Sequence, residues 1–491
     1  MTEDEIATYI GYKGYTIYKE NISVEEQQAL RKELNVKPFV PKSSLIKPQP
    51  FPVYRESKRK LYIPRFYGLE IYGEPDDSLI GEGKKINLKF KGELRQKQKP
   101  VVEKYMKHIK TKSSGLLALH TGFGKTCLAL NIISRINLKT IIVVHKEFLL
   151  RQWIERIEQF LPNARVGKIQ AKTVDTEDKD IVICMLQSLS MKDYPKDMFK
   201  EYGFMIVDEV HHLGAEVFSR AFYKVVTKYA LGLSATIKRK DGLTKVIKWF
   251  LGDVVCKIER KGEDNVLVKV INYETNDEEF NNVVLNFRGQ VNYTGMIKKI
   301  CEFNRRSEFI LKVLSDLLKD NPNQQIMILG HQKKLLQYLH DAIRHRTIST
   351  VGYYVGGMKE KDLKISEGKK VIIATYAMAE EGLDIKTLTT LIMATPKVDV
   401  TQSVGRILRQ KHKQAIVVDI VDPHMLFQRH FGKRRTFYKK SKFKIVQTNM
   451  TGYQNDNWET IYDPINKIKK SFSKATKKED KLLQGVCLIS D

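Results

Sequence analysis

The feature that most constrains the fold is a repeated alternation of short apolar runs with amphipathic stretches. In a first series the runs are GLLALH, TIIVVH, DIVICM, FMIVDE and ALGLSA, and in a second QQIMILG, TISTVGYYV, KVIIAT, TLIMAT and QAIVVDIV. Short continuous apolar runs are typical of parallel strands that helices bury on both faces. The pattern predicts an α/β fold with two tandem doubly wound parallel sheets.

The same pattern divides the chain into segments. Residues 1–85 are rich in Pro and Tyr, lack the alternation and predict a small β-rich accessory domain. We expect the first α/β domain over residues 86–255 and the second over residues 301–424. Between them, residues 256–300 predict a strand followed by an acidic linker or insertion, and residues 425–491 form a basic extension.

The composition narrows the classes of partner. The formal net charge is +28, from 85 Lys and Arg against 57 Asp and Glu. Such a large positive charge favours nucleic acid, a polyanion, as the partner. The alternative is a lysine-rich proteome, in which the excess of Lys and Arg lies on solvated surfaces without a binding role. The five cysteines are far apart and form neither a zinc pattern nor a disulfide framework. With no signal peptide and no membrane span, we expect a soluble protein in a reducing compartment.

The segment HTGFGKT, residues 120–126, lies between an apolar strand and a predicted helix. Its two glycines let backbone N–H groups approach phosphate oxygens, Lys125 reaches the β and γ phosphates, and the hydroxyl of Thr126 suits Mg²⁺. Leu119 stands where the full P-loop pattern has its first Gly, so the segment alone is a weak signal. The residues that we expect around the phosphates are Thr121, Gly122, Phe123, Gly124, Lys125 and Thr126.

Two adjacent carboxylates, Asp208 and Glu209, end the apolar run of MIVDEVHH. At the carboxyl end of a neighbouring strand, Asp208 would face the metal on the nucleotide and Glu209 would polarise the attacking water. An apolar strand that ends in a solvated acidic pair is common. The P-loop upstream favours the catalytic interpretation.

The P-loop, the DEVH box at residues 208–211 and the SAT sequence at residues 234–236 together resemble motifs I, II and III of superfamily 2 helicases. In the second domain, ATYAMAEEGLDI at residues 374–385 resembles motif V, and QSVGRILRQ at residues 402–410 resembles motif VI. The resemblance covers about residues 90–425. It implies two RecA-like domains that bind ATP between them and move along nucleic acid.

The resemblance also implies roles for single residues. Gln98 and Arg95 match the positions that hold the adenine, and Arg406 and Arg409 match the arginines that reach the γ phosphate. Further nucleotide contacts are implied for Gly382 and Asp384, and coupling of hydrolysis to domain movement for His211, Ser234, Thr236 and Gln402. Contacts to nucleic acid, each with an equally good structural interpretation, are implied for His145, Arg151, Gln187, Ser188, Gly330, His331 and Thr375.

The stretch GKRRTFYKKSKFK, residues 432–444, interleaves basic and aromatic residues and contains no acid. Its seven Lys and Arg residues could neutralise seven phosphates, which would make the affinity for nucleic acid fall steeply with rising salt concentration. We therefore expect Lys433, Arg434 and Arg435 to contact nucleic acid. A solvated basic face or a localisation signal is the alternative.

Three segments, DEVH, LSATIKRKDGL and VFSRAFYKVV, resemble the DNA-translocating branch of the superfamily. That branch includes the helicase subunit of the general transcription and repair factor and the transcript-release helicases of poxviruses and other large cytoplasmic DNA viruses. The cellular helicase has an Arg-Glu-Asp loop where this chain has Arg239, Lys240 and Asp241. The resemblance therefore does not imply that this chain separates strands with the same wedge. The viral resemblance implies DNA translocation in transcription or DNA metabolism, an RNA polymerase complex as partner, and a place in the virion and host cytoplasm. For a protein that is not viral, we expect the nucleus or the cytoplasm.

Two other functions stay open. An RNA helicase is one, because DExH boxes serve both polymers and the motor contacts are mostly to the backbone. A polymerase-associated binding factor with a vestigial ATPase is the other, and the full set of ATP-site residues argues against it. Motors of restriction or chromatin remodelling share the motifs, but no nuclease-like constellation or reader module is visible.

Overall fold

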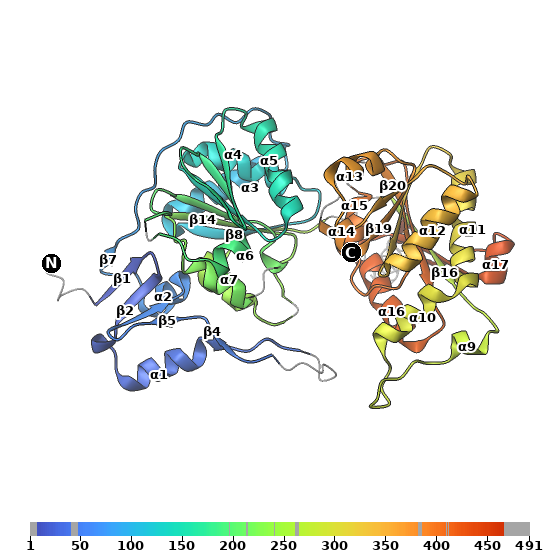
Figure 1. Ribbon diagram of the computed structural model, residues 1–491, viewed down its shortest axis with the longest axis horizontal. Coiled ribbons are helices and arrows are strands. Elements are labelled where there is room, and N and C mark those ends of the chain that lie inside the picture. Colours follow the sequence, from blue (N-terminus) through green and yellow to red (C-terminus); the bar gives the residue numbers. More distant parts are fainter. Residues whose placement is uncertain are drawn as a thin grey trace, which may run out of the picture. The chain divides into compact units, whose positions relative to one another are not determined.

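The computed structural model describes residues 7–40, 48–195, 197–212, 215–239, 241–260, 265–381, 385–408, 410 and 412–465. The chain divides into a first unit, Met1–Glu259, and a second unit, Arg260–Asp491 (Figure 1). Four residues singled out by the sequence lie outside the described residues: Lys240, Gly382, Asp384 and Arg409.

The first unit is built on a sheet that has eight strands within the described ranges. Their order is β11 (Thr173–Asp175), β10 (Val166–Gln170), β12 (Ile181–Met185), β9 (Thr140–Val144), β13 (Phe204–Val207), β14 (Tyr229–Ser234), β8 (Ser114–Leu119) and β15 (Val254–Ile258). Apart from the antiparallel edge strand β11, neighbours run parallel. This topology places the carboxyl ends of β8, β9, β12, β13 and β14 along one edge.

Helices cover both faces of this sheet. Leu117 and Leu119 of β8 pack with one set, and Leu116 packs with the other, as the period of two along a strand requires. The first set is α3 (Lys99–Lys112), α4 (Lys125–Ile136) and α5 (Glu147–Phe160), and the second is α6 (Leu186–Met191), α7 (Ala215–Phe222) and α8 (Thr244–Leu251). Burial on both faces explains why the strands are continuous apolar runs.

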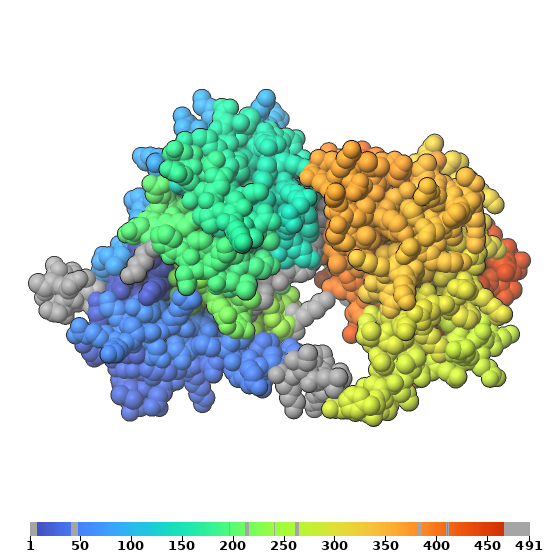
Figure 2. All heavy atoms as spheres, in the orientation of Figure 1, coloured from blue at the N-terminus to red at the C-terminus, as the bar shows by residue number. Residues whose placement is uncertain are grey.

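The N-terminal segment packs against the second helix set. Its sheet has the order β5 (Arg55–Glu56), β6 (Lys60–Ile63), β2 (Gly14–Tyr18), β1 (Thr8–Gly11), β7 (Asp77–Ser78), with α1 (Val24–Glu33), α2 (Arg65–Tyr72) and the pair β3 (Asn35–Val36) and β4 (Phe51–Pro52) beside it. The Tyr67 ring meets Trp249 of α8 edge-on at 5.1 Å, and the buried Tyr223 hydroxyl donates to the Val53 carbonyl at 2.8 Å. Figure 2 shows this segment, in blue, against the green part of the first unit.

The second unit has its own sheet, again of eight strands in the part of the chain that is described. The order is β18 (Val351–Tyr354), β19 (Val371–Thr375), β17 (Gln325–Gly330), β20 (Leu388–Met393), β21 (Ala415–Val421), β16 (Val266–Asn272), β22 (Lys444–Asn449) and β23 (Glu459–Tyr462). Only β23 is antiparallel to its neighbour among these strands. The helices are α9 (Glu278–Asn281), α10 (Tyr293–Glu302), α11 (Asn304–Asp320), α12 (Lys333–His345), α13 (Glu360–Glu367), α14 (Tyr376–Glu381), α15 (Thr401–Arg406), α16 (Met425–Lys440) and α17 (Met450–Gln454).

These two sheets and the small N-terminal sheet confirm the expected fold class. The segment limits differ from expectation in two places. Residues 256–300, expected to be a linker, contribute β16, which pairs with β21 and β22 inside the second sheet. Residues 425–491, expected to be a separate extension, contribute α16, β22 and β23 to the same unit. Within the described residues, no helix is long and apolar enough to cross a membrane.

A buried ion pair fastens α16 to the second sheet. Arg434 is 0% exposed and bonds Asp419 of β21 through two nitrogens, each at 2.8 Å, while the Tyr438 hydroxyl donates to the same carboxylate at 3.0 Å. Arg434 therefore cannot contact nucleic acid as expected, because its guanidinium lies inside the protein. Lys433 and Arg435, its neighbours in sequence, are exposed. The helical period turns the middle residue of KRR inward.

We predict that Asp419→Ala lowers the free energy of unfolding of the second unit by about 3–5 kcal/mol, because the Arg434 charge would stay buried without its partner. Lys433→Ala, on the exposed face of the same helix, should change it by no more than about 0.5 kcal/mol. Denaturant unfolding of both variants measures the difference. Equal stability of the two would contradict the structural role of Arg434.

Candidate functional site

The loop between β8 and α4 is shaped by two glycines. Gly122 and Gly124 have φ values of 82° and 90°, which disfavour any residue with a side chain. A Cβ on Gly124 would lie 2.5 Å from Nε2 of Gln98, whereas a Cβ on Gly122 would meet no atom within 4 Å. The loop thus opens onto free space directly before the N-terminus of α4. This arrangement suits phosphate oxygens, because it offers backbone N–H groups and the helix dipole.

Gln98 and Arg95 bind the back of this loop. Gln98 is 2% exposed, and its amide nitrogen donates to the carbonyls of Phe123 at 2.9 Å and Gly124 at 3.3 Å. Its amide oxygen accepts from the Arg95 N–H at 2.8 Å, and Nη2 of Arg95 donates to the Gly122 carbonyl at 3.2 Å. Both side chains hold the loop in place. Their contact with adenine stays a prediction.

Asp208 follows the end of β13 and is buried. Its Oδ1 accepts from the Glu209 N–H and its Oδ2 from Nε1 of Trp153, each at 2.9 Å. Burial, followed by the nearby Glu209 charge, raises the pKa of Asp208 to about 6, while Lys125 and the Trp153 bond oppose the rise. The sequence reasoning missed Trp153 of α5. The signal was available, because a buried indole N–H usually needs an acceptor.

Glu209 lies opposite the P-loop lysine. Nζ of Lys125 is 2.7 Å from Oε1 of Glu209, and both side chains are largely buried. Glu209 has a left-handed backbone, with φ 49°, directly after the strand. Its second oxygen lies 3.4 Å from Nδ1 of His211. The structure therefore brings together Lys125, Asp208 and Glu209 from the ends of strands that are not neighbours in sequence.

His211 links this cluster to the end of β14. Its Nδ1 is 2.7 Å from Oγ of Ser234, which is buried and also accepts from the Thr236 N–H at 3.2 Å. Nη1 of Arg239 donates to the His211 carbonyl at 3.3 Å, and its Nε donates to Asp241 at 2.9 Å. The residues expected to couple hydrolysis to movement in the first unit form one continuous set of hydrogen bonds.

The expected strand contacts of the first unit follow β9 and β12. Nε2 of Gln187 donates to the His145 carbonyl at 2.9 Å, which ties the ends of the two strands together. Ser188 is buried, and its hydroxyl accepts from the Ala171 N–H at 2.9 Å, so that group supports a turn. Arg151 is paired with Glu147 one turn earlier in α5. The buried Ser188 hydroxyl therefore fits a structural role better than a contact with nucleic acid.

In the second unit, Gly330 and Thr375 lie opposite each other at the ends of β17 and β19. His331 follows, with Nδ1 2.7 Å from Oγ1 of Thr395. Arg406 at the end of α15 is buried and donates to the carbonyl of Glu380. Gln402 is half-buried on the same helix. Five expected site residues of the second unit therefore lie in its described strands, loops and helices: Gly330, His331, Thr375, Gln402 and Arg406.

Trp153→Phe should raise the pKa of Asp208 further, because the lost N–H stabilises the charged carboxylate. If the ionised form binds the cation of the nucleotide, the acid limb of kcat/KM for ATP hydrolysis moves up by roughly one pH unit. A pH profile of the two proteins measures this. Trp249→Phe, the same change in the distant α8, serves as control, and an equal shift in both variants would contradict the assignment.

Comparisons with known proteins agree with these motifs. A family model described as "Type III restriction enzyme, res subunit" matches residues 91–239. "Putative ATP-dependent RNA helicase L396" of Acanthamoeba polyphaga mimivirus is 36% identical over 458 residues, which cover 90% of this chain and 87% of the relative. "Putative helicase 161L" of Invertebrate iridescent virus 6 is 28% identical and covers 72% and 83% of the two chains.

African swine fever virus has a further relative, "Putative ATP-dependent RNA helicase QP509L", which is 27% identical over 71% of this chain and 74% of its own. The crystal structure of T4 UvsW covers 90% of this chain and 99% of its own, with 17% identity and a TM-score of 0.34. The extent and identity of the mimivirus match show that this chain belongs to the superfamily 2 helicases, which are nucleic-acid-dependent ATPases, in a group with putative helicases of large DNA viruses.

Proposed function

We propose that this helicase couples ATP hydrolysis to translocation along DNA. One observation carries the ATPase part: Lys125, Glu209 and Asp208 meet in one partly buried cluster beside an open phosphate loop. Lys125 follows β8 and the adjacent Asp208 and Glu209 follow β13, so two strand ends that are far apart in sequence meet at this cluster. The same cluster is where a phosphoanhydride would need charge and an oriented water.

In this proposal each group has one task. Lys125 leaves Glu209 to bind the β and γ phosphates, and Glu209 then accepts a hydrogen bond from the attacking water. Thr126 and Asp208 would hold Mg²⁺, which supplies positive charge beside the phosphate oxygens. Arg406, together with Arg409, would stabilise charge on the γ phosphate. Gly382 and Asp384 are proposed as further nucleotide contacts.

The hydrogen bond between His211 and the Ser234 hydroxyl, together with the one that Ser234 accepts from the Thr236 N–H, supports a coupling role. Glu209 lies next to His211, so a change of partner at Glu209 would disturb the His211 ring and, through it, the end of β14. Gln402 is proposed to take the corresponding role in the second unit. These residues would transmit hydrolysis to the contacts with the polymer.

DNA is our preferred polymer. The charge of +28 supports a polyanion, and the matching family model is described as a subunit of a restriction enzyme. The names of L396 and QP509L favour an RNA helicase as the second candidate. The resemblance to transcript-release helicases supports action on transcription complexes with an RNA polymerase, in the virion and host cytoplasm.

We predict that duplex or single-stranded DNA stimulates ATP hydrolysis by the wild type more than single-stranded RNA does. Glu209→Gln should lower the stimulated kcat by about 10²–10⁴-fold, because the water loses its acceptor. Steady-state ATPase assays with each polymer measure both effects. Glu216→Gln, an exposed change on α7, should leave kcat unaltered.

Stimulation by RNA alone would replace the DNA assignment with the RNA helicase. Hydrolysis that no polymer stimulates would contradict translocation on either. A Glu209→Gln enzyme with wild-type kcat would contradict the role proposed for Glu209, whichever polymer stimulates the reaction.

A further inference from the structure

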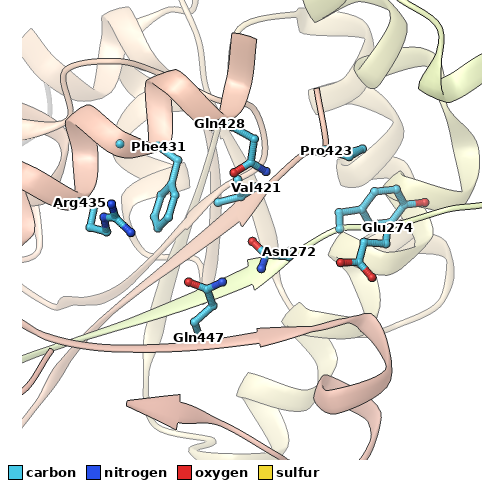
Figure 3. Close-up of a pocket in the computed structure, with 10 residues that line it drawn as sticks. Asn272, Glu274, Val421, Pro423, Gln428, Phe431, Arg435 and Gln447 are labelled. Atoms are coloured by element: carbon cyan, nitrogen blue, oxygen red, sulfur yellow. The ribbon is translucent and has the colours of Figure 1, made fainter. Parts of the chain in front are cut away.

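A cavity of about 390 Å³ lies in the second unit between α16 and the sheet, at the carboxyl ends of β21, β16 and β22 (Figure 3). None of the residues that line it belongs to the ATP site or to the segments that resemble motifs V and VI. Its volume is at the lower end of the range for small-molecule sites. We call it the α16 cavity.

Strand register builds the floor of the α16 cavity. Asn272 of β16 pairs in register with Val421 of β21, and Val270 pairs with Gln447 of β22. Because side chains two residues apart share a face, Asn272 and Gln447 point to the same side of the sheet. Figure 3 shows both amides directed toward the space below α16, with Gln428 of that helix approaching from the opposite side.

One stripe of α16 forms the roof, since Gln428, Phe431, Gly432 and Arg435 follow helical spacing. A Cβ built on Gly432 meets no atom within 4 Å. Glycine in a helix interior is less stable than alanine, and neither packing nor φ requires it here. The glycine therefore leaves space open rather than allowing close contact.

The lining groups match one class of ligand. Three amides and the Glu274 carboxylate line the cavity, and the Gln428 nitrogen also donates to the Asp422 carbonyl at 3.0 Å. Together these groups still offer both donors and acceptors, as the edge of a nucleobase requires. Phe431 is 6% exposed and supplies an aromatic wall, and Cζ of Arg435 lies 5.9 Å from the centre of its ring. A flat ring with mixed donors and acceptors fits between these groups, and Arg435 at the mouth suits the phosphate that follows.

The position of the cavity relates it to the polymer. β16 and β17 are three strands apart in a parallel series, so Asn272 and Gly330 end at the same edge, roughly 14 Å apart at about 4.8 Å per strand. At about 3.4 Å per stacked nucleotide, a strand of roughly four nucleotides would span the distance between Asn272 and Gly330. Lys433, Lys439 and Lys440 are exposed on the same helix.

We propose that the α16 cavity receives one unstacked nucleobase of the DNA strand that passes over the second unit. The inference rests on the proposed function for the identity of the polymer. It adds a base-binding step to a motor whose other expected contacts are to the backbone. Bases would enter and leave the cavity as the strand moves.

Single-stranded DNA of 20 nucleotides that carries 5-iododeoxyuridine tests this with the full-length protein. After ultraviolet crosslinking, mass spectrometry should find the adduct on Phe431 or Tyr273, both of which line the cavity. Gly432→Leu fills the cavity, so it should abolish the adduct and raise the Kd for DNA about tenfold, the effect of one lost stacking contact. Thr436→Leu adds the same side chain one turn further along α16, at an exposed position outside the cavity lining, and should change neither.

Asn272→Ala combined with Gln447→Ala repeats the test without altering α16, and thermal unfolding checks that each variant is folded. No adduct in the cavity, or an adduct that survives Gly432→Leu, would overturn the proposal. Competition by free thymidine monophosphate as strong as competition by the oligonucleotide would also overturn it, since the cavity would then bind mononucleotides. ATPase assays on the same samples separate the two proposals: polymer stimulation without an adduct rejects only the base site, and an adduct without stimulation rejects only the motor.

Discussion

The ion pair between Lys125 and Glu209 is the interaction on which the proposed chemistry depends. Nζ of Lys125 lies 2.7 Å from Oε1 of Glu209, so the lysine charge is compensated by the carboxylate that we propose as acceptor for the attacking water. A buried charge without a partner would be costly, so the pair stabilises the site before nucleotide binds. In the proposed mechanism nucleotide binding exchanges these partners: the phosphates bind Lys125, and Glu209 becomes available as an acceptor.

Buried side chains around the pair hold it in place. Trp153 of α5 donates a hydrogen bond to Asp208, and Gln98 donates one to the phosphate loop that precedes Lys125. The carboxylates and the loop are therefore each held by a residue from outside their own sequence motif. His211 carries the arrangement onward to β14. A change of partner at Glu209 would reach Ser234 through two contacts, which gives the proposed coupling of hydrolysis to movement a physical path.

Some of this was predictable from the sequence and some was not. Continuous apolar runs gave both sheets, because parallel strands buried on two faces leave that pattern. The meeting of Lys125 with Glu209 followed from strand ends sharing an edge. By contrast, β16 pairs with strands more than a hundred residues away, which no local pattern reveals. Arg434 lies in a basic run of the sequence, yet it is buried and pairs with Asp419. The hydrogen bond from Trp153 to Asp208 was not predicted, because a single tryptophan in an amphipathic helix has the pattern of an ordinary core residue.

Equilibrium binding of ATP to Lys125→Ala and Glu209→Gln tests the exchange of partners most directly. Lys125→Ala should weaken binding at least about tenfold, because the phosphates lose a charged donor. Glu209→Gln should bind ATP at least as tightly as the wild type, because the competing carboxylate is gone while the lysine remains. If both substitutions weaken ATP binding equally, Glu209 is needed to hold the nucleotide, and the account of this site is wrong.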